Sequence, residues 1–209
     1  MNGNGKIKKY GEGREALLAA VVHLVAEQGL DGFSYRRVAD RAGVNNTLIS
    51  HHFGSKEALL EAATEWAVSR SQQLTDFAAN ASVDEDFAQR LTQIVAEEPQ
   101  LQLFQYQMIL ASGRSDQMRQ MAARLYDSYL DNMLDMFERD GLPRDRDMAR
   151  AVFAALDGLV LQQVTVATPG QIRASILKLG QLIRGWAAET SDQLPAARPA
   201  AAPSPSGQA

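Results

Sequence analysis

The chain has 209 residues, of which 45% are apolar, and a formal net charge of −4 at pH 7. This composition is ordinary for a globular protein that buries a core, and the length suits one or two domains. There is no cysteine, which excludes a disulfide framework, a thiolate metal site and a cysteine nucleophile, and which fits a reducing, cytoplasmic location.

The charge is unevenly distributed along the chain. Residues 1–62 hold eight Lys and Arg against seven Asp and Glu, whereas the remainder is acidic. A mildly basic N-terminal segment on an acidic body suits a protein that touches phosphates with one end only. We expect residues 1–11 to form a flexible basic arm.

The first long apolar segment is predicted to be a helix over residues 12–28. Its run ALLAAVVHLVA is interrupted by His23 and bordered by Glu15 and Glu27, which argues against a secretory signal. No stretch of the sequence approaches the roughly 20 apolar residues of a membrane span, so we expect no membrane partner.

Residues 34–60 read as two short helices joined by a tight turn. Ser34 is a suitable N-cap for a helix over 35–42, and Gly43 follows where a helix end needs a positive φ. Asn45 can cap a second helix that runs to about residue 52. Small residues at 39 and 43 would let the first helix pass closely over the second.

The second of these helices has an almost wholly polar face. Such a face on the second of two closely packed helices predicts a helix-turn-helix that places this helix in the DNA major groove. The alternative is a structural helical hairpin without a DNA-binding role.

Further helices are predicted along the rest of the chain. Ser55 caps a long connecting helix over about 56–80, and later helices are expected over 84–97, 100–111, 115–140, 145–167 and 169–188. No alternating strand pattern occurs, so the predicted fold class is all-α. The expected domains are a head over 12–62, a helical effector-binding and dimerisation domain over 63–190, and a disordered tail over 191–209.

Apolar residues in the last helix follow steps of four and three from Ile172 to Trp186, which predicts a narrow helix-packing seam. Gly158, Gly180 and Gly185 would weaken their helices, and we expect close approach of the last two helices to compensate.

The chain resembles the TetR (tetracycline-repressor-like) family of transcriptional regulators. The resemblance is carried by residues 14–34, by VADRAGV at 38–44 and by HHFGSKEALL at 51–60. It implies an all-helical homodimer whose two heads read a palindromic double-stranded DNA operator. It also implies dimerisation through the last two long helices, at about 145–188, and a repressor that a small-molecule effector releases.

The resemblance assigns DNA contacts to the head. Ser34 and Lys56 would meet phosphates, and residues of the second hairpin helix would face bases or backbone. Many members have lysine and tyrosine where this chain has Asn46 and Ser50, so the operator sequence cannot be transferred. Because Asn pairs well with adenine, Asn45 or Asn46 reading an A·T pair is a hypothesis. The DNA-binding candidates are Ser34, Arg36, Arg37, Asn45, Asn46, Thr47, Ser50, His51, His52 and Lys56.

Effector contacts are harder to predict, because apolar side chains in a helical body are also ordinary core residues. Asp157 within an apolar helix would pair across the dimer, cap a local kink or meet a cationic ligand, and the structural roles are favoured. The ligand-binding candidates are Trp66, Phe104, Met108, Met121, Tyr126, Phe153 and Asp157.

An enzyme is disfavoured, because no HExxH, GxSxG, Glu-x-x-His or phosphate-binding glycine motif is found in the sequence. We therefore expect no catalytic residue, no metal and no cofactor other than the effector. A helical adaptor with reduced DNA binding is the alternative function.

Overall fold

The computed structural model describes residues 10–75 and 82–193. Most of the predicted arm and tail therefore lie outside the described residues. Within the described ranges all regular structure is helical, which confirms the all-α prediction. The helices are α1 (Tyr10–Gln28), η1 (Leu30–Gly32), α2 (Tyr35–Ala42), α3 (Asn46–Phe53), α4 (Lys56–Thr75), α5 (Glu85–Glu97), α6 (Pro99–Leu110), η2 (Ala111–Arg114), α7 (Asp116–Arg139), α8 (Arg146–Thr165) and α9 (Pro169–Gln193).

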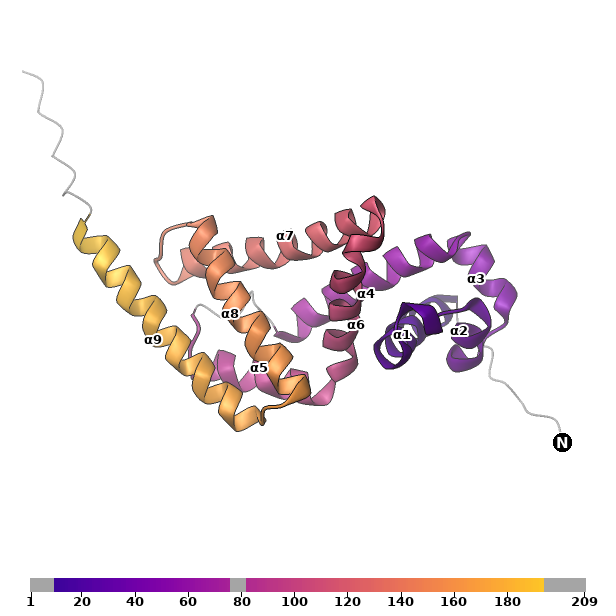
Figure 1. The fold of residues 1–209 in the computed structure, drawn as a ribbon, viewed down its shortest axis with the longest axis horizontal. Coiled ribbons are helices and arrows are strands. Elements are labelled where there is room, and N and C mark those ends of the chain that lie inside the picture. Colours follow the sequence, from indigo (N-terminus) through magenta and orange to yellow (C-terminus); the bar gives the residue numbers. More distant parts are fainter. Residues whose placement is uncertain (1–9, 76–81, 194–209) are drawn as a thin grey trace, which may run out of the picture.

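Helices α1, α2 and α3 form the head at one end of the molecule, and α9 lies at the opposite end (Figure 1). Helix α4 leads from the head into a body made of α5 to α9. No helix within residues 10–75 and 82–193 is long and apolar enough to cross a membrane.

Side-chain caps set most of the helix starts that the sequence predicts. Asn45 Oδ1 accepts a hydrogen bond from Thr47 N at 3.0 Å, and Ser34 Oγ accepts a longer one from Arg37 N at 3.4 Å. Each cap satisfies an amide that the first helical turn would leave without a partner. Equivalent bonds, each accepted from a backbone N–H by a cap side chain, start α4, α5, α7 and α8; the accepting residues are Ser55, Asp84, Ser115 and Asp145.

The first of two hydrophobic cores joins the head to the body. Leu17, Leu18 and Val21 of α1 are fully buried, and the cluster around them includes Ile49 of α3 and Phe104 of α6. The predicted boundary at residues 62 and 63 therefore falls inside the continuous helix α4, and the head does not close its core alone.

The second core fills the body between α5, α7, α8 and α9. Ile172, Ile176 and Ile183 of α9 are buried in it, so the seam predicted for the last helix packs helix on helix as expected. The packing partners are α5 and α8 of the same chain. The three buried isoleucines of the seam are thus used within the protomer.

One expectation about glycine is wrong. Gly180 of α9 is buried against the backbone carbonyl of Val83, in the segment just before α5, so its close approach is not to α8. No atom lies within 4 Å of the place that a Cβ would occupy at Gly158 or Gly185. Close packing within the protomer therefore explains only Gly180.

Replacing Gly180 by alanine should destabilise the protein by about 1–3 kcal/mol, because the new methyl group would overlap the Val83 carbonyl. Gly170→Ala is the matched control in the same helix, since a Cβ there meets nothing within 4 Å. Urea unfolding followed by circular dichroism measures both. Equal stabilities of the two variants would contradict this close contact.

Candidate DNA-binding surface and ligand cavities

The turn between α2 and α3 depends on the backbone conformation of Gly43. Its φ of 66° is left-handed, and Val44 N donates to Ala39 O at 3.1 Å across the turn. A Cβ at position 43 would meet no atom within 4 Å, so conformation rather than space favours glycine there. The turn allows α3 to cross α2 at short range.

Helix α3 buries one side and exposes the other. Ile49 is fully buried in the head core, whereas the polar side chains predicted to meet DNA are exposed. Thr47 Oγ1 donates to Asn45 Oδ1 at 3.0 Å, and Ser50 Oγ donates to the Thr47 carbonyl at 3.1 Å. Asn46 makes no side-chain hydrogen bond to any residue that the structure describes, so its amide is available to a base edge. The exposed candidates on and before α3 are Asn45, Asn46, Thr47, Ser50 and His51.

The two candidate arginines of α2 differ in the contacts that they make within the protein. Arg37 Nη1 donates to Gln28 Oε1 at 2.8 Å and to Gly32 O at 3.1 Å, which ties α2 to the end of α1. Arg36 is 89% exposed, and its Nε lies 3.9 Å from Asp40 Oδ2. Arg36 is therefore the better placed of the two arginines to reach a phosphate.

The last three DNA-binding candidates lie at helix ends: Ser34 at the start of α2, His52 near the end of α3 and Lys56 at the start of α4. Lys56 Nζ lies 4.8 Å from the centroid of the Phe33 ring and stays exposed at the start of α4. Ser34 is exposed at the start of α2, and His52 is half-buried with its ring centroid 6.0 Å from that of Phe53.

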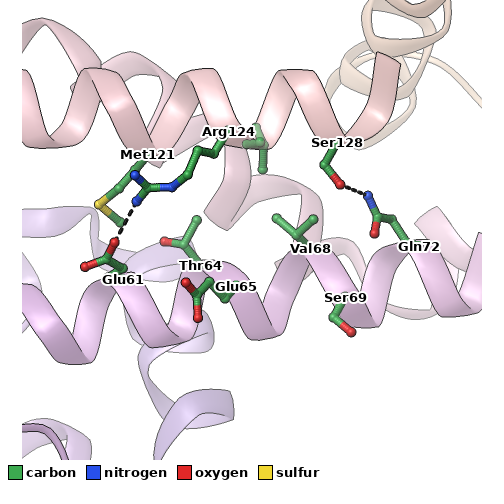
Figure 2. A pocket seen from close by; sticks show the side chains of 10 residues that line it. Glu61, Thr64, Glu65, Val68, Ser69, Gln72, Met121, Arg124 and Ser128 are labelled. Carbon is green, nitrogen blue, oxygen red and sulfur yellow. Dashed lines mark hydrogen bonds and ion pairs between the residues drawn. The ribbon is translucent and has the colours of Figure 1, made fainter. Parts of the chain in front are cut away.

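A cleft of about 260 Å³ lies between α4 and α7 (Figure 2). Arg124 Nη2 of α7 reaches Glu61 Oε1 of α4 at 2.6 Å, and Gln72 Nε2 bonds Ser128 Oγ at 2.5 Å. These two links join its walls, and Val68 lies between them in the picture. Met121 is the only predicted ligand-binding residue that lines this cleft.

A second, inner cavity of about 50 Å³ lies between α4, α5, α6, α7 and α8. Three of the predicted ligand residues line it, namely Tyr126, Phe153 and Asp157. Sequence reasoning missed Gln105, Tyr106 and Tyr129, which line it as well. The sequence did offer a signal for these residues, because α6 is an apolar helix that contains several glutamines and a tyrosine. Burying a glutamine amide in an apolar core brings no packing advantage, so such a residue points to a polar cavity.

Trp66, Phe104 and Met108 line neither the cleft nor the inner cavity. Phe104 and Met108 are buried in the core shared by head and body, and Trp66 packs against that core half-buried. These three residues thus occupy core positions, and ligand contact by any of them stays a prediction.

The inner cavity holds a carboxylate in unusual surroundings. Burial raises the pKa of Asp157, and the hydrogen bond from Tyr106 partly opposes that effect. The Tyr106 hydroxyl lies 3.0 Å from Asp157 Oδ1 and 2.9 Å from the Asp157 carbonyl oxygen. Burial also raises the pKa of Tyr106 far above its usual value, so this phenol remains a hydrogen-bond donor. Asp157 thus lies in the inner cavity and not on the outer face of α8.

Within residues 10–75 and 82–193 no group of three His, Asp or Glu side chains is placed to hold a metal ion.

Two family models match the chain. Residues 17–63 match the model of bacterial regulatory proteins of the tetR family, and residues 82–182 match the tetracyclin repressor-like C-terminal domain. The first match covers α2 and α3 with most of α1, and the second covers nearly the whole body. The two matched ranges together account for most of the chain.

Relatives and solved structures agree with these matches. The transcriptional regulator BetI of Serratia proteamaculans is 36% identical over 83 residues, which are 40% of this chain and 42% of that protein. BetI of Klebsiella pneumoniae is 29% identical over 165 residues, covering 75% of this chain and 84% of that protein. A TetR-family structure from Streptomyces coelicolor superposes with a TM-score of 0.61 at 25% identity, covering 80% of this chain and 98% of the other.

The matched models include both the head that carries α3 and the helical body that holds the two cavities. The relatives are regulators rather than enzymes, which agrees with the expectation from the sequence motifs. The chain belongs to the TetR family of DNA-binding transcriptional regulators.

Proposed function

We propose that the protein is a cytoplasmic repressor that binds a palindromic operator as a homodimer and leaves it when a small molecule occupies the body. The observation that carries this proposal is a set of exposed apolar side chains on and beside α8 and α9. In Figure 1 these two helices lie on the side of the body away from α3.

The exposed large apolar residues of the described chain are concentrated on this surface. Leu182 of α9 is 62% exposed, Leu161 of α8 is 45% exposed, and Val166 just after α8 is 85% exposed. A groove of about 470 Å³ runs between the two helices, and Ala154, Ala155, Gly158 and Leu182 are among the residues that line it. Exposed large apolar side chains near a groove are typical of an interaction site.

A second copy of the chain suits this surface. Small side chains along α8 let another helix approach closely, and the open space beside Gly158 is then explained by a partner helix. A two-fold dimer uses the same patch on both subunits, so α8 and α9 of each would form a four-helix contact. The two heads would face a palindrome because operator symmetry mirrors protein symmetry.

The helices that wall the inner cavity also support the head, which favours ligand control. Helix α6 packs on α1, and α4 packs on both α1 and α3. A ligand that prefers one arrangement of α4 and α6 would therefore bias the position of α3. Differential affinity of this kind is what an allosteric effector requires.

Selection of random duplex DNA on the full chain, at two salt concentrations, tests the proposal. We expect a motif with two half-sites related by a two-fold axis, and an affinity that falls steeply as salt increases. Failure to select any motif would contradict the repressor and favour the helical adaptor.

Leu182→Glu should weaken the dimer, because it places a carboxylate in the apolar α8–α9 surface. Analytical ultracentrifugation should show a shift toward monomer, and operator affinity should fall with it. Leu110→Glu is the matched control, since Leu110 is 80% exposed at the end of α6 and lies outside this surface. Equal behaviour of the two variants would exclude α8 and α9 as the interface.

Asn46→Ala should relax base preference at one position of each half-site, with a loss of about 1–3 kcal/mol for the preferred base. Arg36→Ala should instead weaken binding to all sequences and reduce the salt slope by about 1. Arg146→Ala, at the start of α8, is the control for loss of charge. Fluorescence anisotropy on a set of single-base operator variants measures all three. A uniform loss for Asn46→Ala would contradict base reading by this residue.

A further inference from the structure

The inner cavity of the body contains a carboxylate that lacks a cationic partner. Asp157 is half-buried and accepts a hydrogen bond from Tyr106, but it forms no ion pair with any residue in the described part of the chain. Carboxylates inside proteins are normally paired with a cation, because desolvation of an isolated charge is costly. The cavity thus supplies half of an ion pair.

Aromatic rings surround the same space. Tyr106, Tyr126, Tyr129 and Phe153 all line the cavity beside Asp157. The Phe153 ring stacks on Tyr129 with centroids 5.1 Å apart, and meets Tyr126 at 5.8 Å with nearly perpendicular planes. Aromatic faces carry partial negative charge and attract alkylammonium groups, most strongly where water is excluded.

A third group in the cavity independently indicates a ligand. The Gln105 side chain is buried, and its Nε2 has no hydrogen-bond partner, although its Oε1 accepts a bond from the Tyr129 hydroxyl at 3.0 Å. A buried amide donor without a partner is rare and costs free energy. An acceptor oxygen on a bound molecule would satisfy it.

The size of the cavity limits the ligand. A volume of about 50 Å³ is several times the minimum that holds one water molecule, so a ligand of a few non-hydrogen atoms fits. The larger α4–α7 cleft is the less suitable cation site, because Arg124 brings a positive charge into its lining and pairs with Glu61, which leaves Glu65 as the other carboxylate there.

We propose that the inner cavity binds a small organic cation that carries an oxygen atom. Asp157 is its counter-ion, the four aromatic rings form the wall around its ammonium group, and the Gln105 amide donates to its oxygen. This inference deepens the effector role proposed above and rests on it.

Calorimetric titration of the full chain with three isosteric probes tests the inference directly. Ethanolammonium has both the charge and the oxygen, 1-propanol replaces the ammonium group by methyl, and propylammonium replaces the hydroxyl by methyl. We expect one ethanolammonium site per chain, with 1-propanol bound at least about ten-fold more weakly and propylammonium in between. Equal binding of 1-propanol, or no binding of ethanolammonium, would overturn the proposal.

Two variants locate the site. Asp157→Asn keeps the shape and the acceptor for Tyr106, but it should abolish the preference for ethanolammonium over 1-propanol. It should also raise the melting temperature of the ligand-free protein, because a desolvated carboxylate is removed. Glu65→Gln is the matched control, since it removes a carboxylate from the α4–α7 cleft and leaves the inner cavity unchanged. Loss of the preference in Glu65→Gln but not in Asp157→Asn would place the site in the cleft and refute the inference.

Measuring operator binding by the same samples, with and without the cation, distinguishes failure of the cation site from failure of the proposed repressor function. Sequence-specific DNA binding without a response to any cation would overturn the cation site alone. Cation binding by a chain that selects no DNA motif would support the site and overturn the repressor.

Discussion

Helix α1 has to be covered on more than one side, and the rest of the structure depends on this constraint. Seven apolar residues between Leu17 and Val25 are buried, which is more than one face of a helix can place against the short helices α2 and α3. Helix α6 covers the remaining surface with Leu101, Phe104 and Met108. The head therefore shares its core with the body, and a movement of α6 would change the packing of α1.

This shared packing gives the body a physical connection to DNA. The inner cavity is lined by Ser71 and Thr75 of α4 and by Gln105 and Tyr106 of α6. Other residues of the same two helices pack against the head. Packed interiors transmit displacement because they contain little free volume. A ligand held by Gln105 and Tyr106 would act directly on α6, which packs on α1 of the head.

Much of the fold was predictable, because caps and helix-ending glycines are local signals. Ser34, Gly43 and Asn45 define α2 and α3 within a residue of the expected bounds. Long-range partners were not predictable, and Gly180 meets Val83 rather than α8 because a periodic pattern does not identify the facing helix. Tyr126, Phe153 and Asp157 do meet at one cavity, whereas Phe104 and Met108 belong to the shared core, since an apolar side chain looks alike in core and pocket.

If a cation bound in the body displaces α3, it should change the separation of the two DNA-binding heads within one dimer. Because the chain has no cysteine, Asp40→Cys introduces a single spin-label site on the exposed side of α2. Double electron–electron resonance then measures the distance between the labels of the two heads. We expect one inter-subunit distance that shifts when ethanolammonium is added and does not shift in the Asp157→Asn background. Absence of an inter-subunit distance, or a distance unchanged by saturating ethanolammonium, would contradict it.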